Sequence, residues 1–303
     1  MTNLRTATVL VNPAARGVHR GFDGARVIAY LGRRQVHARL VVPASPQEAT
    51  RAAEAAAQRG DNLFFAIGGD GTVRDAALGL RGSKTALAAI PAGTVNVWAR
   101  EAGIPAGLRA ALDSHLGGQV AAMDLGLAGS QCFMLMAGIG WDAEIARRTS
   151  LPLKRRVGDL AYVAQALRML PQLRPHPARW ESNGVSRDAP LAWMVLGNTR
   201  LYGGHIRLTP NASITDGLLD LLALCPRSAW DGAALAARVA VLRTHGQRRI
   251  FEERTAEVRI ETPGLAVQLD GDYAGETPMT FAVDPAALWV SVPAGPLAPI
   301  FGC

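Results

Sequence analysis

Glycine, aspartate and threonine gather in residues 68–72, which read GGDGT. The apolar run 63–67 before them predicts a buried strand, and the pattern after them predicts a helix with Thr72 as its N-cap. A glycine turn at this junction lets the backbone approach a phosphate, and the first N–H groups of the helix point toward it. Because phosphate repels a carboxylate unless a cation lies between them, Asp70 indicates Mg²⁺ or proton transfer. A tight turn with a capping aspartate is the simpler alternative.

Two further junctions place polar residues after a predicted strand. Strand 6–11 leads into Asn12, and strand 85–90 leads into Gly93 and Thr94. Open α/β sheets bind ligands at the carboxyl ends of their strands, so the three junctions predict one ligand-binding edge. For Asn12 the alternative is a side chain that only holds a backbone turn.

The elements that must position these loops alternate between strand and helix. Helix 22–34 and strand 36–42 follow the first loop, and Ser45 and Glu48 form a capping box with Pro46 at the first helical position. This β-α-β-α-β-α order predicts a parallel sheet. We place the domain boundary near Asp124, with an α/β domain at 1–124 and a second domain at 125–303. The last residues of the second domain could pack back on the first.

The second half has a different pattern. Turns rich in Gly, Pro, Asn and Asp separate short apolar runs, which predicts a mostly β domain. The predicted strands are 132–137, 191–197, 218–224, 257–260, 266–269, 280–283 and 288–292. Helices are expected at 153–170 and 230–245. The first carries Lys154, Arg155 and Arg156 beside apolar residues, which fits either an ordinary solvated helix or a basic face on anionic lipid.

Length and composition bound the function classes. The chain has 303 residues, 49% of them hydrophobic, and a net charge of +7. It has room for two domains, and the charge favours anionic partners. Nucleic acid is the weakest of these, since no basic run interleaved with aromatics occurs. No stretch is long and apolar enough for a membrane span, and no signal peptide is evident. Three cysteines without metal-ligand spacing favour a reduced, cytoplasmic protein.

Five motifs together give the chain its resemblance to a known family. They read VNPAARG at 11–17, GGDGTVRDAALGL at 68–80, PAGTVNVWARE at 91–101, YGGHIRLTPNASITDGLLDLLAL at 202–224 and LDGDYAGETP at 269–278. In this order they resemble the diacylglycerol kinase catalytic-domain family, which includes bacterial lipid kinases and sphingosine kinases. The resemblance implies a phosphofructokinase- or NAD kinase-like α/β domain, then an antiparallel β-sandwich, with the active site in the cleft between them.

The resemblance also implies cofactors and residue roles. The expected cofactors are ATP and Mg²⁺. The expected partner is a lipid at an anionic membrane surface, and a homodimer is a further possibility. Asp70 matches a Mg²⁺- or nucleophile-orienting carboxylate, and Asp272 the general base. The residues that match ATP-contacting motifs are Asn12, Gly68, Gly69, Gly71, Thr72, Gly93 and Thr94.

Three other residues receive roles from the same resemblance. Asp142 falls where relatives place a substrate-contacting acid, and the alternative is a residue at a helix start. Asp216 resembles a structural Mg²⁺ ligand, with the backbone carbonyl near Leu218 as co-ligand; the alternative is a turn before a strand. For Asp272 the alternative is a hairpin-turn aspartate, because Asp270 and Gly271 precede it.

The sequence departs from the family pattern at three places. Val97 stands where many bacterial relatives have aspartate, Ala15-Arg16-Gly17 stands where Ser-Gly-Lys is common, and Asp272 stands where glutamate is usual. Val97 puts diacylglycerol specificity in question and motivates one alternative function, a lipid- or nucleotide-binding protein without turnover. NAD kinase-like enzymes also use GGDG loops, but the motifs at 202–224 and 269–278 speak against them.

Overall fold

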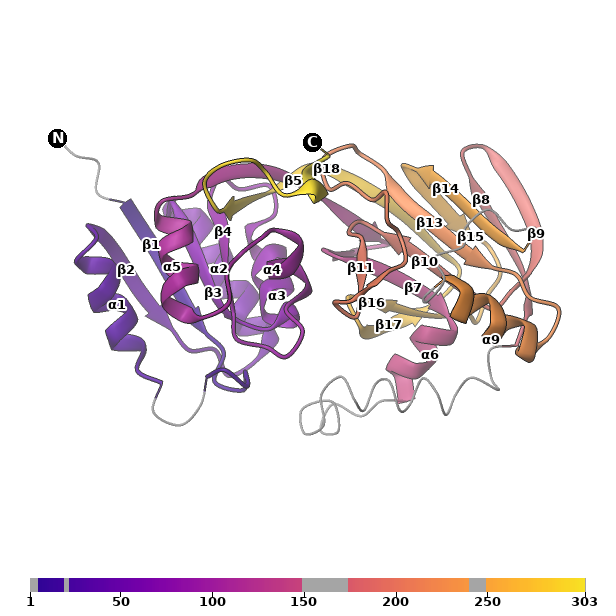
Figure 1. The fold of residues 1–303 in the computed structure, drawn as a ribbon, viewed down its shortest axis with the longest axis horizontal. Coiled ribbons are helices and arrows are strands. Elements are labelled where there is room, and N and C mark those ends of the chain that lie inside the picture. Colours follow the sequence, from indigo (N-terminus) through magenta and orange to yellow (C-terminus); the bar gives the residue numbers. More distant parts are fainter. Residues whose placement is uncertain (1–4, 19–21, 149–173, 240–248, 303) are drawn as a thin grey trace. The chain divides into compact units, whose positions relative to one another are not determined.

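The computed structural model describes residues 5–18, 22–148, 174–239 and 249–302, which form two compact units (Figure 1). The first unit contains 5–124 and 286–302, and the second contains 125–285. The predicted helix 153–170, and with it the basic cluster at 154–156, lies outside the described residues, as does part of the predicted helix 230–245.

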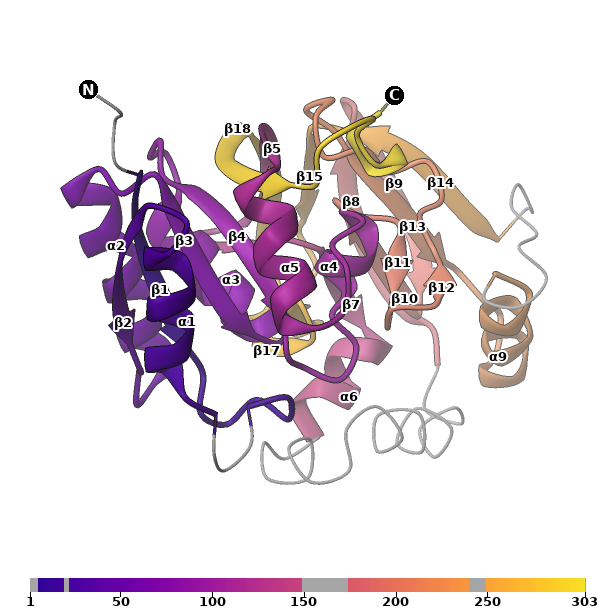
Figure 2. The same cartoon turned by 60° about the vertical axis from the view of Figure 1, so that its left-hand side comes forward.

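The first unit is an α/β domain built on a parallel sheet. Its alternating elements are β1 (Arg5–Val11), α1 (Gly24–Gly32), β2 (Val36–Val41), α2 (Pro46–Arg59), β3 (Leu63–Gly68), α3 (Asp70–Leu80) and β4 (Ala86–Pro91). The strand order is β2-β1-β3-β4, with every neighbouring pair parallel. Helices α1 and α5 (Leu108–Leu116) lie on one face and α2 and α3 on the other (Figure 2). The predicted parallel sheet is confirmed.

Local sequence explains where these helices begin and end. Ser45 caps α2 by accepting the N–H of Glu48, whose carboxylate accepts the N–H of Ala44, and Gly60 ends the helix in the left-handed region at φ 71°. The prediction of Thr72 as an N-cap is wrong. The helix begins at Asp70, because Gly69 is extended and its carbonyl already accepts the N–H groups of Thr72 and Val73.

The chain returns to the first unit through β18 (Met279–Val292). Val290 of this strand lies beside Leu87 of β4 in a parallel pairing. The 3-10 helix η3 (Pro299–Phe301) then packs Phe301 edge-on against Trp98 of α4 (Val97–Glu101), with ring centroids 6.5 Å apart. The residues that complete the first unit therefore come from both ends of the sequence.

The second unit consists of two antiparallel sheets. The first has the order β14-β13-β10-β7-β16-β17, and the second joins the start of β18 to β15, β8 and β9, with β5 paired to β18 and β6. The bounds are β5 (Gln119–Ala128), β6 (Gln131–Phe133), β7 (Met136–Gly140), β8 (His176–Ser182), β9 (Val185–Leu191), β10 (Trp193–Gly197), β13 (Leu219–Leu224), β14 (Ile250–Thr255), β15 (Glu257–Ile260), β16 (Ala266–Leu269) and β17 (Asp272–Glu276). A short pair, β11 (Leu201–Tyr202) and β12 (Ile206–Arg207), stands apart.

A buried core joins the two sheets of this unit. Phe133, Trp180 and Phe281 from one sheet meet Met194 and Val267 from the other, all nearly inaccessible to solvent. The predicted β-sandwich is thus confirmed. Two helices flank it, α6 (Trp141–Arg148) and α9 (Ala229–Ala237). None of the helices in the described part of the chain is long and apolar enough to cross a bilayer.

Three strand predictions in this half need correction. The run 191–197 is not one strand, since residue 192 separates the end of β9 from β10. The run 132–137 is not one strand, since residues 134 and 135 separate β6 from β7. Conversely, 280–283 and 288–292 belong to the single strand β18, although Pro285 and the positive φ of Ala286 (50°) interrupt its regular geometry. The N–H of Ala286 bonds to the Asp124 carboxylate at 2.8 Å, at the point where the strand passes from one unit to the other.

Candidate functional site

Three loops meet at the carboxyl end of the parallel sheet in the first unit. Asn12 follows β1, Gly68 and Gly69 follow β3, and Gly93 follows β4. The Asn12 side chain donates to the Thr72 hydroxyl at 2.8 Å, which joins the first loop to the start of α3. The carbonyl of Asn12's own side chain accepts the N–H of Ala14, so this residue also holds the backbone turn that the sequence suggested.

The glycines at this edge occupy positions that a side chain would fill. A Cβ atom on Gly68 would lie 2.4 Å from the Thr72 hydroxyl oxygen, and one on Gly93 would lie 2.5 Å from the Cα of Gly69. Real Cβ atoms do not approach other atoms so closely, so Thr72 packs against residue 68, and the β4 loop touches the β3 loop at Gly69, only because Gly68 and Gly93 lack side chains. The contact leaves an edge lined by backbone, which is the surface that a phosphate group needs.

The start of α3 leaves its backbone donors without a side-chain cap. Gly69 is the N-cap residue and offers no side chain to bond the first N–H groups of the helix. Gly71, in the first turn, is exposed, as is Thr94 in the neighbouring loop. Uncapped N–H groups and the positive end of the helix dipole together favour an anion at this position.

Asp70 connects the second loop to the third. Its two carboxylate oxygens accept the backbone N–H groups of Val97 at 3.0 Å and of Trp98 at 3.1 Å, which fixes the start of α4. Asn96 shapes the same loop: its side chain accepts the N–H of Gly93 and donates to the Gly93 carbonyl, both at 2.9 Å.

In the second unit, Asp272 follows a two-residue hairpin turn. Asp270 and Gly271 join β16 to β17, with φ values of 50° and 87°, and Leu269 pairs with Asp272 across the turn. Positive φ at both turn residues is the geometry that Asp-Gly pairs favour. Asp272 is partly exposed at the first position of β17. The turn alternative named for this segment therefore describes Asp270 rather than Asp272.

Asp270 anchors this hairpin through three backbone contacts. Its carboxylate accepts the N–H groups of Met134 at 2.8 Å, Leu135 at 2.8 Å and Met136 at 3.0 Å. Met134 and Leu135 separate β6 from β7, and Met136 begins β7, so the Asp270 carboxylate bonds to the backbone where the predicted strand 132–137 is interrupted. These three hydrogen bonds of Asp270 also fix the position of Asp272, two residues further along the chain.

We expect Asp270→Asn to lower the free energy of unfolding by about 2–3 kcal/mol. The amide keeps one acceptor oxygen, but its NH₂ group would face a backbone N–H that then lacks a partner. Urea denaturation measures the change, and Asp188→Asn, at an exposed position of β9, is the matched control. Equal stability of the two variants would contradict the anchoring role.

Asp142 lies in the core of the second unit, at the start of α6. Its side chain is fully buried, and Oδ2 accepts the Gln268 amide at 3.1 Å and the Tyr202 hydroxyl at 3.5 Å. A Cβ on Gly138 would lie 2.0 Å from the same oxygen, so the strand beside Asp142 must carry glycine. Oδ1 has no hydrogen-bond partner among the described residues. This carboxylate therefore has an unused acceptor.

Gln268 couples Asp142 to the hairpin that carries Asp272. While its amide nitrogen donates to Asp142, its amide oxygen accepts the N–H of Gly271 at 2.6 Å. An aromatic cluster surrounds the same carboxylate, since Trp193 packs edge-on against both Trp141 and Tyr202. In the second unit, Gln268 thus links Asp142, the expected substrate-contacting acid, to the hairpin that carries Asp272, the expected general base.

Burial raises the pKa of Asp142 to about 6 from an ordinary value of 3.8, although Gln268, Trp193, the N–H of Ala143 and Tyr202 oppose the shift. The Trp193 indole N–H lies outside hydrogen-bonding geometry with any described residue, so we treat it as a neighbouring dipole and not as a bonded donor. The folded state therefore favours the protonated acid, and stability falls as pH rises from 3.8 to about 6.

We expect Asp142→Asn to remove this pH dependence. Relative to the parent, its free energy of unfolding should rise by about 3 kcal/mol between pH 4 and pH 7, because asparagine has no charge to bury. Urea denaturation of both proteins across that range makes the measurement. Parallel stability curves would show that the buried carboxyl does not titrate in this window.

Asp216 and Leu218, the predicted structural Mg²⁺ ligands, lie in the turn before β13. One Asp216 oxygen accepts the N–H of Leu218 at 3.0 Å, and the other pairs with the Arg254 guanidinium. Arg254 Nε also lies 3.4 Å from the Asp220 carboxylate. The described residues contain no cluster of three acidic, histidine or cysteine side chains. Arg254 thus supplies the positive charge beside Asp216, and this donor set does not fit Mg²⁺.

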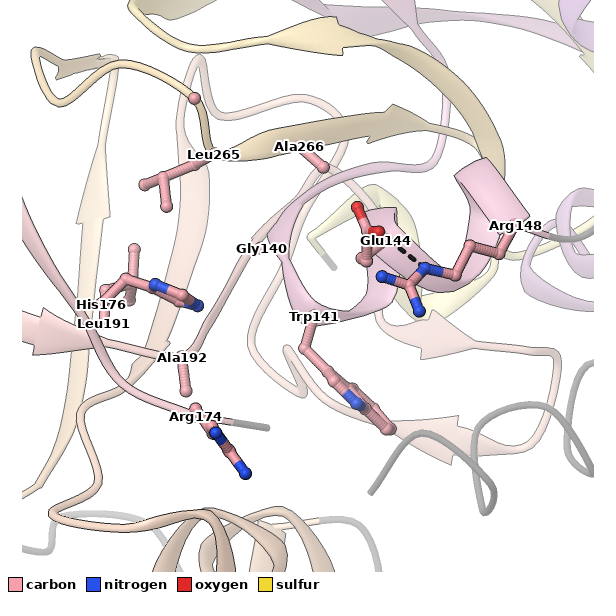
Figure 3. A pocket seen from close by; sticks show the side chains of 11 residues that line it. Gly140, Trp141, Glu144, Arg148, Arg174, His176, Leu191, Ala192, Leu265 and Ala266 are labelled. Atoms are coloured by element: carbon pink, nitrogen blue, oxygen red, sulfur yellow. Dashed lines mark hydrogen bonds and ion pairs between the residues drawn. The ribbon is translucent and has the colours of Figure 1, made fainter. Parts of the chain in front are cut away.

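A cavity of about 550 Å³ opens beside α6 in the second unit (Figure 3). Trp141, Leu191 and Leu265 supply apolar walls. Arg148, Arg174 and His176 line it with basic groups, and Glu144 bonds to Arg148 at 2.7 Å. The volume lies in the range of small-molecule sites, and the lining suits a ligand with an apolar part and an anionic or polar part.

Comparison with known proteins assigns both units. Residues 6–128 match the model of the diacylglycerol kinase catalytic domain, and residues 136–292 match that of the YegS C-terminal NAD kinase beta sandwich-like domain. A diacylglycerol kinase of Bacillus subtilis (strain 168) is 32% identical over 242 residues, which cover 77% of this chain and 78% of that protein. The chain belongs to the diacylglycerol kinase family. The resemblance seen in the five motifs is therefore confirmed.

Other members of this family show the same extent of similarity. A probable YegS-like lipid kinase of Pseudomonas putida is 34% identical over 251 residues, covering 82% of this chain and 83% of the relative. A crystal structure of a putative diacylglycerol kinase from Bacillus anthracis str. Sterne superposes with a TM-score of 0.81 at 21% identity, over 97% of each chain. The latter supports the fold of an α/β domain followed by an antiparallel sandwich.

Sequence reasoning overlooked several residues that organise this kinase-family site. Asp270 was taken for a turn residue, and neither Gln268 nor Asn96 was singled out. The available signal was weak, because Gln268 is simply one polar residue within an apolar strand and Asn96 lies in a motif already assigned to ATP. Only the contacts show that each one holds a predicted site residue in place.

Proposed function

We propose that this protein is an ATP-dependent lipid kinase that phosphorylates a hydroxyl group of diacylglycerol or a related lipid. The observation that carries the proposal is the convergence of three loops on the uncapped start of α3, which combines backbone donors, close-packed glycines and the Asp70 carboxylate. Family membership supports the phosphoryl-transfer class, and the relatives named diacylglycerol kinase support a lipid acceptor.

The first unit is proposed to bind ATP. Gly68, Gly69, Gly71 and Gly93 would let the backbone approach the phosphates, and the polar side chains that would contact the nucleotide are Asn12, Thr72 and Thr94. Asp70 fits a Mg²⁺ ligand, because it places a carboxylate at the start of α3, where the phosphates would bind. Mg²⁺, when bound, would neutralise charge on the phosphates.

The second unit is proposed to bind the lipid. Asp272 would accept the proton of the lipid hydroxyl as its oxygen bonds to the γ-phosphorus, while the bond between that phosphorus and the bridging oxygen breaks and ADP leaves. Oδ1 of Asp142, which has no partner among the described residues, suits a polar group of the substrate. Gln268 would hold Asp142 in a fixed position relative to the hairpin that carries Asp272. The cavity beside α6 is our candidate for the lipid body.

The test is phosphoryl transfer itself. The purified protein would be incubated with γ-labelled ATP, Mg²⁺ and separate vesicles containing diacylglycerol, monoacylglycerol, ceramide or sphingosine, and the lipid products would then be resolved. We expect label in one or more lipid products. Parallel reactions would offer NAD⁺ or a sugar as the acceptor, and label in NADP⁺ or a sugar phosphate, with none in any lipid, would overturn the proposal.

A second candidate is a nucleotide- or lipid-binding relative without turnover. Val97 favours it, because the position that carries aspartate in many bacterial relatives holds an apolar side chain that is 7% exposed. Calorimetry discriminates the two: ATP binding with no phosphorylated lipid in the panel would support this candidate. The proposed place of action for either protein is the cytoplasmic face of an anionic membrane.

A further inference from the structure

Helix α9 presents an apolar face to solvent. It reads AWDGAALAA and packs on the second unit through Gly232, Leu235 and Ala236. On its other side Trp230 is 84% exposed, and Ala234 and Ala237 are exposed as well. Surface helices of soluble proteins usually carry polar residues on their outer face. Figures 1 and 2 show α9 on the outside of the strands of the second unit.

The start of the helix is held firmly. Ser228 caps it by accepting the N–H of Asp231, and the Asp231 carboxylate accepts the N–H of Arg227 at 2.8 Å. The same carboxylate pairs with the Arg249 guanidinium at the start of β14. Asp231 is the one charged residue of the helix, and these contacts turn its charge toward the protein. Trp230, in the first turn of α9, is therefore held on a well-anchored helix start.

Basic residues border the exposed indole. Arg227 precedes the helix, Arg238 follows it, and both are exposed, while the Arg249 side chain is 38% exposed. Asp231 pairs with Arg249, so its charge is offset within the protein, and Arg227 and Arg238 place exposed basic side chains near the two ends of α9. Tryptophan between basic residues is the composition of protein surfaces that sit at the headgroup level of an anionic bilayer.

We propose that α9 is a membrane anchor: Trp230 inserts among the headgroups of an anionic bilayer, and Arg227 and Arg238 contact the lipid phosphates. This inference rests on the proposed function in one respect, since a lipid kinase must meet its substrate at a membrane interface. The proposal identifies α9 as a second membrane-binding surface, in addition to the basic cluster at 154–156 suggested by the sequence.

The experiment compares vesicle binding of the parent and Trp230→Ala by flotation. Vesicles of phosphatidylcholine with phosphatidylglycerol would be compared with phosphatidylcholine alone. We expect the parent to prefer anionic vesicles, and Trp230→Ala to weaken partitioning about ten-fold or more, because an indole is lost from the interface. Arg227→Glu with Arg238→Glu should remove the anionic preference. Trp289→Ala, at an exposed tryptophan of the first unit, is the control and should bind like the parent.

Further readouts separate the alternatives. Circular dichroism checks that each variant is folded. Unchanged vesicle binding by Trp230→Ala would overturn the proposal, and so would a parent that binds no vesicles. Light scattering that finds a dimer in the parent and a monomer in Trp230→Ala, with vesicle binding retained, would assign the face to a second copy instead. If the parent phosphorylates no lipid but Trp230→Ala still loses vesicle binding, the proposed function fails and the anchor stands.

Discussion

Replacing Asp272 with asparagine is expected to reduce lipid phosphorylation by roughly 10²–10⁴ while ATP affinity stays within a few-fold of the parent. Asparagine keeps the size of the side chain but cannot accept the proton of the lipid hydroxyl. The neighbouring Asp270, which holds the hairpin, is untouched by this change. We therefore expect the loss to appear in turnover and not in stability.

The measurement is paired on one preparation: ATP affinity by calorimetry and phospholipid formation from labelled ATP. Glu276→Gln is the matched control, because this acidic residue lies on the same strand and pairs with Arg147 at 2.9 Å. The control should retain near-parental turnover. Full activity of the Asp272→Asn protein would remove Asp272 from the role of general base.

Asp70→Asn is expected to lower turnover by about 10²–10³, the effect typical of a group that stabilises charge in the transition state. The structure adds a second consequence. Both carboxylate oxygens hold the N–H groups of Val97 and Trp98, so an amide at this position would also loosen the start of α4. We expect a measurable loss of stability together with the loss of activity.

Two measurements separate these effects. Turnover as a function of Mg²⁺ concentration reports the metal role, since a lost ligand raises the Mg²⁺ requirement, and urea denaturation reports the anchoring of α4. The control is Asp23→Asn, which retains a good N-cap on α1 and should change neither. Near-normal turnover of folded Asp70→Asn protein at low Mg²⁺ would rule out the metal role, whatever its stability.

Much of the first unit follows from local sequence. Its strands are apolar runs, its helices start and end at capping residues such as Ser45 and Gly60, and its glycines follow strands directly. The second unit was harder to predict. Strands β8 and β9 alternate polar and apolar residues with charges such as Arg179 and Asp188, so no apolar run marked them. Pairing with a neighbouring strand, and not local preference, decides such segments.

The sequence by itself determined the family, the two-domain order and the identity of the predicted site residues, because these depend on motifs that are local in the chain. The tertiary structure decided what holds those residues. Asp70 bonds to the backbone of Val97, which is 27 positions later in the sequence. Asp270 bonds to the backbone at the break between β6 and β7, at sequence separations of 134 to 136 positions, and Gln268 bonds to Asp142 at a separation of 126 positions. Such contacts join segments that only folding brings together, so no spacing in the sequence could reveal them. The exposure of Trp230 has the same origin, since a tryptophan beside alanines reads as core until the packing shows which face of its helix is covered.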